Sequence, residues 1–205
     1  PEETSTAYIM GEITKTLSDK YNVTIVCGPE VYDQNKLTVL PKSSLIAGVT
    51  TIRVKGIKEN KANKLSRIRK FLLMSWRLYK ASKKVINKGD KVLLVSNPFP
   101  LLILMAFHRK KMDYEISFLA HDLFPEPLLM RFKLPNLVYR QCLNIFNRSY
   151  ARMDKIISLG RDMTDVLREK TMPYNPNLEI IQIENWGDIN SIYPMDTHSD
   201  SDKIT

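Results

Sequence analysis

The feature that most constrains this chain is a series of short runs rich in Val, Ile and Leu. Such nearly continuous apolar runs are typical of strands in a sheet covered on both faces. Stretches with helical spacing separate most of them, and this alternation predicts a parallel sheet. We therefore expect an α/β fold: a Rossmann-like, doubly wound, mostly parallel sheet with helices on both faces. The expected strands are 22–27, 51–56, 91–96, 114–120, 155–160 and 178–184.

The predicted helices occupy most of the segments between these strands. The chain begins with a loop and a helix, whereas a doubly wound domain usually begins with a strand, so we expect the first strand to be missing. From the composition of its two ends, we expect the chain to be a piece of something larger. We expect one domain over 1–192 and an interdomain linker over 193–205. The expected helices are 5–20, 64–87, a short apolar one after Asn97-Pro98, 136–151 and 161–170.

Charge and composition limit the partners and the cellular compartment that we expect for this protein. The formal net charge is +9, which favours anionic partners such as nucleic acid, acidic lipid or phosphorylated substrates. No apolar run approaches the roughly 20 residues of a membrane span. The two cysteines, Cys27 and Cys142, suggest neither a disulfide framework nor a metal site, and this favours the cytoplasm.

Several sequence patterns of common enzymes are absent. The chain has no GxGxxG or Walker A pattern, which argues against self-contained dinucleotide or ATP binding. It also has no HExxH, paired CxxC or GxSxG pattern, so nothing supports a metalloprotease, a zinc site or a serine hydrolase. We expect no metal in this domain.

Ligands of open parallel sheets bind beyond the carboxyl ends of the strands, and this rule points to a few loops. His121 directly follows the strand YEISFLA, and Asp122 comes next. A histidine there could position a hydroxyl group or exchange a proton near neutral pH. The alternative is a surface histidine hydrogen-bonded to Asp122. Glu126 lies between two prolines, which suits either a binding site or a rigid loop.

The predicted helix 64–87 has two unlike faces. Leu73 and Trp76 stand among the cations, as in a helix that contacts an anionic membrane, although an ordinary solvated face is the alternative. The residues expected to pack on the sheet are Leu65, Ile68, Phe71, Leu72, Ser75, Leu78, Tyr79, Val85 and Ile86. The residues expected to contact a membrane are Arg69, Lys70, Leu73, Trp76, Arg77, Lys80 and Lys84.

Five segments resemble the N-terminal half of family 4 glycosyltransferases of the GT-B type. They are PEETSTAYIMGEITKTLSDKYNVTIVCG, VLLVSNPFP, FLAHDLFPE, DKIISLGRDM and IIQIENWGDINSIYP. The likeness spans nearly the whole chain. It is greatest to the amino-sugar transferases, of the WbuB kind, that build O-antigen, capsule and colanic-acid-like polysaccharides.

This resemblance implies an acceptor-binding lobe of a retaining glycosyltransferase. Such a lobe closes on a C-terminal lobe that binds a UDP- or GDP-sugar and carries an E-x7-E motif, a spacing that no glutamate pair has here. The acceptor would be a lipid-diphosphate-linked saccharide at the cytoplasmic face of the membrane. We expect this chain to hold no cofactor and to be inactive without the second lobe.

The resemblance also assigns roles to residues. The catalytic residues would be His121, Asp122 and Glu126. His121 would orient the transferred sugar, and Asp122 and Glu126 would support its loop. The acceptor-binding residues would be Glu2, Glu3, Thr4, Ser5, Asn97 and Arg161.

Two other functional classes are compatible with the sequence. The net charge permits a basic α/β module that binds nucleic acid, although no recognised binding motif is present and we expect no nucleic-acid partner. A complete enzyme of another α/β class, such as a deaminase or reductase, is the other alternative.

Overall fold

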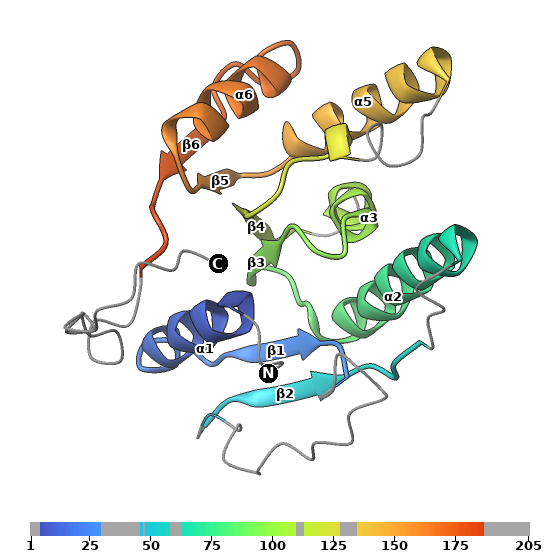
Figure 1. Ribbon diagram of the computed structural model, residues 1–205. Helices are drawn as coiled ribbons and strands as arrows, with labels where there is room; N and C mark the ends of the chain where they lie inside the picture. Colours follow the sequence, from blue (N-terminus) through green and yellow to red (C-terminus); the bar gives the residue numbers. More distant parts are fainter. Residues whose placement is uncertain are drawn as a thin grey trace, which may run out of the picture.

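The computed structural model describes residues 5–29, 46, 48–57, 63–109, 113–127 and 135–186. Helices and strands alternate along most of this part of the chain (Figure 1). Every predicted element is confirmed, with ends within three residues of the predicted ones. The order is α1 (Ser5–Ser18), β1 (Thr24–Cys27), β2 (Thr50–Arg53), α2 (Lys64–Val85), β3 (Lys91–Val95), α3 (Pro100–His108), β4 (Glu115–Ala120), α5 (Asn136–Tyr150), β5 (Lys155–Ser158), α6 (Arg161–Thr171) and β6 (Glu179–Gln182).

All pairs of neighbouring strands in the described part of the chain are parallel, which confirms the predicted fold class. The described strands form two sheets, one of β1 and β2 and one in the order β3-β4-β5-β6. In the larger sheet Ala120 of β4 pairs with Ser158 of β5, which pairs with Gln182 of β6. Because this register keeps the strands level, their carboxyl ends meet at one edge.

Helices lie on both sides of the strands. α2, α3, α5 and α6 form a row in which each helix packs against the next, and α1 lies on the other side of the strands (Figure 1). Right-handed crossovers between successive parallel strands β3 to β6 put their connecting helices on the same face. This arrangement leaves the carboxyl edge of the larger sheet to the loops.

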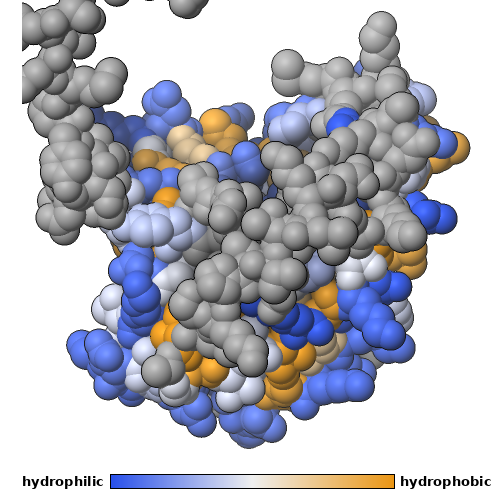
Figure 2. All heavy atoms as spheres, turned by 60° about the horizontal axis from the view of Figure 1, so that its bottom comes forward, coloured by the Kyte–Doolittle hydropathy of each residue, from blue (hydrophilic) through white to orange (hydrophobic). Residues whose placement is uncertain are grey.

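The core lies between the larger sheet and this row of helices. Phe118, Ile116 and Ile156 of the sheet pack with Met105 of α3 and Leu167 of α6, all essentially inaccessible to solvent. Outside this core, the face in Figure 2 shows apolar groups separated by hydrophilic ones. No helix of the described residues is long and apolar enough to cross a membrane.

Helix α2 packs differently from the prediction. Ser75 and Leu78 are buried and Phe71 is half-buried, as expected, but Leu65 and Leu72 are 74% and 55% exposed and Ile68 is also exposed. The helix contacts the core through residues 71–86, with the Phe71 ring 5.2 Å from the Phe99 ring. The helical wheel placed the packed face too far toward Leu65, Ile68 and Leu72, which the structure leaves exposed on the same side of the helix as Trp76.

Candidate functional site

The residues that follow β3 to β6 at the carboxyl edge of the larger sheet form the candidate site, here called the rim. It comprises Ser96, Asn97, His121, Asp122, Gly160, Arg161 and Glu184. The parallel register brings these segments to one edge, with neighbouring strands about 4.8 Å apart. The rim is therefore assembled from residues as far apart in sequence as Ser96 and Glu184.

Ser96 joins the first two segments of the rim. Its hydroxyl oxygen accepts hydrogen bonds from the backbone N–H groups of His121, at 2.9 Å, and Asp122, at 3.1 Å. The side chain is 2% exposed, so these bonds lie in a dry environment where losing a partner is costly. Ser96 thus fixes where the chain leaves β4 and where His121 begins its loop.

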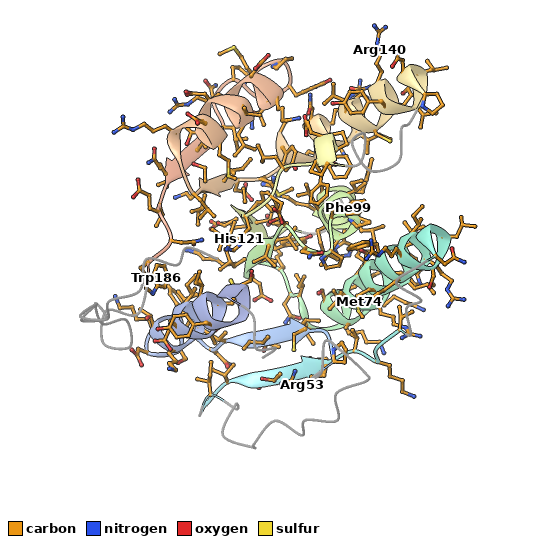
Figure 3. The ribbon with its side chains drawn as sticks, viewed as in Figure 1. Arg53, Met74, Phe99, His121, Arg140 and Trp186 are labelled. Atoms are coloured by element: carbon orange, nitrogen blue, oxygen red, sulfur yellow. The ribbon has the colours of Figure 1, made fainter. Side chains whose placement is uncertain are left out.

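The His121 ring has unused hydrogen-bonding capacity. It lies at the end of β4 (Figure 3), and both ring nitrogens are buried without a hydrogen-bond partner. The alternative of a histidine bonded to Asp122 is therefore not what the structure shows. Burial lowers the pKa of the His121 imidazole, and the Asp122 carboxylate opposes this to a smaller extent. A neutral imidazole offers one donor and one acceptor to a ligand.

Glu126 is engaged away from His121. Its carboxylate forms an ion pair with Lys170, which is 7% exposed and lies in the last turn of α6, while its second oxygen is buried without a hydrogen-bond partner. Lys170 is nine residues from Arg161, roughly 13 Å along the helix axis. This contact ties the loop after β4 to the end of α6 remote from the rim.

An open depression occupies the rim beside β5 and β6. Arg161 and Asp162 of the first turn of α6 line it together with Gln182 and Glu184 of the β6 end. Side chains of both charge signs and an amide therefore face the same space. Such a set can bind a ligand that both donates and accepts hydrogen bonds, as a polyhydroxylated molecule does.

The other predicted site residues are placed only in part. Asn97 is exposed directly beyond β3, and Asp122 is exposed beside His121. Ser5 begins α1, and Glu2, Glu3 and Thr4 lie outside the described residues. Among the residues described, no three His, Cys, Asp or Glu side chains are grouped to hold a metal ion.

Sequence reasoning missed two residues that shape the site. No role was predicted for Ser96. A serine that directly follows the apolar strand KVLLV and precedes a turn is nevertheless a buried polar group in need of hydrogen-bond partners. Lys170 gave no signal, because a lysine in the last turn of an amphipathic helix is usually solvated.

No family model matches the chain. Over 111 residues, 53% of its length, the chain is 30% identical to a probable glycosyltransferase, WbjE, of Pseudomonas aeruginosa. The matched part is 27% of that protein, so the chain spans about a quarter of the relative's length.

Proposed function

We propose that this chain is the acceptor-binding lobe of a retaining glycosyltransferase of family 4. The enzyme transfers a sugar from a UDP- or GDP-sugar, held by a second lobe, to a lipid-diphosphate-linked saccharide. In this assignment the chain takes part in the synthesis of a bacterial surface polysaccharide such as capsule or O-antigen, and it acts at the inner face of the cytoplasmic membrane.

The observation that carries this proposal is the 30% identity to a probable glycosyltransferase. The architecture is compatible with it, because open parallel sheets bind their ligands beyond the carboxyl ends of the strands. The rim adds suitable chemistry: an imidazole without a hydrogen-bond partner and a depression with mixed polar groups.

His121 is the residue proposed to act on the reacting sugar. A neutral imidazole with a donor and an acceptor can orient two hydroxyl groups, or orient one and accept its proton. The lowered pKa keeps the ring neutral near pH 7, which preserves the acceptor nitrogen. Ser96 supports this role by holding the backbone on which the ring is carried.

The remaining residues are assigned to acceptor binding. Arg161 supplies a cation for the phosphate groups, and Asn97 supplies an amide at the neighbouring strand end. Glu2 to Ser5 complete the acceptor site in this proposal. Glu126 supports the loop through its ion pair with Lys170 rather than through contact with substrate.

The test is sugar transfer in the enzyme that unites this lobe with its donor-binding lobe. The assay uses radiolabelled UDP- and GDP-sugars and a synthetic farnesyl-diphosphate-linked N-acetylhexosamine. His121→Ala is expected to lower kcat by about 100-fold or more while the protein remains folded.

Lys88→Ala is the matched control, since this exposed lysine lies before β3, at the amino ends of the strands. Its turnover should equal that of the wild type. Wild-type turnover in His121→Ala would remove His121 from the mechanism, and absence of any transfer by the wild type across donors would contradict the assignment.

A further inference from the structure

Helix α2 carries an exposed apolar strip that the fold does not use. It consists of Leu65, Ile68, Leu72, Leu73 and Trp76, here called the α2 ridge, and each of these side chains is exposed. Leu65, Ile68, Leu72 and Trp76 follow one another at intervals of three or four residues, so they line one side of the helix over about 16 Å.

The ridge is separate from the packed face of the same helix. Met74, Ser75 and Leu78 face the core, and Met74 is marked on α2 in Figure 3. At about 100° per residue, the ridge is centred roughly 140° around the helix from these residues. The helix lies on the outside of the molecule beside α3 (Figure 1), so the ridge faces away from the core.

Cations continue the ridge toward the end of the helix. Lys80, Lys83 and Lys84 are exposed on the same side, and the Lys80 ammonium lies 5.9 Å from the centre of the Trp76 ring. Arg69 is exposed within the ridge itself. The helix contains eight Lys and Arg residues and no Asp or Glu. An apolar strip bordered by the exposed cations Arg69, Lys80, Lys83 and Lys84 therefore covers one side of α2.

Not every cation of α2 is directed to that side. The Arg77 guanidinium donates hydrogen bonds to the backbone carbonyls of Lys55, at 2.7 Å, and Gly56, at 3.0 Å. This residue therefore holds the segment after β2 against α2. Lys70 is half-buried at the flank of the exposed side.

We infer that α2 lies in the surface of an anionic lipid bilayer, with the ridge buried among the acyl chains and Lys80, Lys83 and Lys84 at the headgroups. Helices that lie in an interface combine one apolar side with bordering cations, and each cation near the surface adds about 1 kcal/mol. A tryptophan is suited to this depth, because its apolar ring carries one polar N–H group.

The combination of ridge and cations favours lipid over other partners. Nucleic acid would use the cations but would leave five exposed apolar side chains without a partner. A second copy packed ridge to ridge would bring two sets of lysines together at a cost in charge repulsion. An anionic bilayer satisfies both kinds of side chain at once.

The most direct test is the environment of Trp76, one of two tryptophans in the chain. In Trp186→Phe, Trp76 is the sole emitter, and its emission should shift to shorter wavelength when vesicles containing phosphatidylglycerol are added. Brominated acyl chains should quench it. In the matched variant Trp76→Phe, emission from Trp186 should not shift. An unchanged Trp76 spectrum with bound vesicles would overturn the assignment.

Flotation with the same vesicles tests the two components of the surface separately. Lys80→Glu/Lys83→Glu should lower binding at least about tenfold, and Leu72→Gln/Trp76→Gln should lower it comparably. Lys20→Glu/Arg168→Glu changes the net charge equally at exposed residues outside α2 and should have a much smaller effect. Circular dichroism verifies that each variant is folded.

Three results would overturn the lipid assignment. They are equal loss in the α2 and control variants, binding to DNA but not to vesicles, and a dimer in gel filtration that the ridge substitutions dissociate. These readouts need no sugar transfer, so they separate failure of the membrane surface from failure of the proposed enzymatic role.

Discussion

The two sheets of this molecule differ in how deeply they are buried. The side chains described as fully buried all belong to residues 75–171, in the larger sheet, the helices that cover it and the loops that join them. The side chains of β1 and β2 are at most half-buried, and Val26 reaches the core only from its periphery. The rim lies at the carboxyl edge of this larger sheet, and its residues Asn97, Asp122 and Arg161 are exposed. The difference indicates that the candidate site is positioned by the most stable part of the molecule.

The largest effect is expected from substitutions that create a cavity in each sheet. Ile156→Ala in β5 should lower the free energy of unfolding by about 3 kcal/mol, because the side chain is fully buried. Val26→Ala in β1 should cost about 1 kcal/mol, since the side chain is only partly buried. Urea denaturation measures both values, and equal losses would contradict the proposed difference.

The second effect concerns the ion pair between Glu126, in the loop after β4, and Lys170 of α6. Lys170→Met should cost about 2 kcal/mol, because it leaves the partly buried Glu126 carboxylate without its cation. Adding Glu126→Gln should recover part of the loss, since the unpaired charge is then gone. A double variant no more stable than Lys170→Met would show that the ion pair does not hold this loop.

A smaller effect is expected at the joint between β3 and β4. Ser96→Ala should cost about 1 to 2 kcal/mol, because the buried N–H groups of His121 and Asp122 lose their acceptor. Amide hydrogen exchange at these two residues should accelerate more than exchange in β5. Unchanged exchange would mean that another group holds the start of the loop.

The smallest effect is a pH dependence. The folded-state pKa of His121 lies below its usual value of 6.5, so the unfolded chain takes up the proton more readily. The contribution of His121 to stability is therefore complete above pH 6.5 and declines as the pH falls toward the folded pKa. His121→Gln should make the acid-side loss of stability less steep. A steeper loss in His121→Gln than in the wild type would contradict this sign.

The order and type of the elements could be predicted because hydrophobic runs and helical spacing are local properties of the chain. The packed side of α2 was misjudged at Leu65 and Leu72, because a helical wheel does not tell where along its length a helix meets the sheet. The hydrogen bond from the His121 N–H group to the Ser96 hydroxyl spans 25 residues, and the ion pair of Glu126 with Lys170 spans 44. Both depend on sheet register and helix placement, which the sequence does not display locally.

The most direct measurement of the central claim is the response of the histidine rings to an acceptor. The chain contains three histidines, and His108 is buried in the core beside Tyr114. In a titration with farnesyl-diphosphate-linked N-acetylhexosamine, the ring ¹⁵N signals of His121 should move and saturate while those of His108 stay fixed. His121 signals that remain unchanged at saturating acceptor would contradict an acceptor site at this rim.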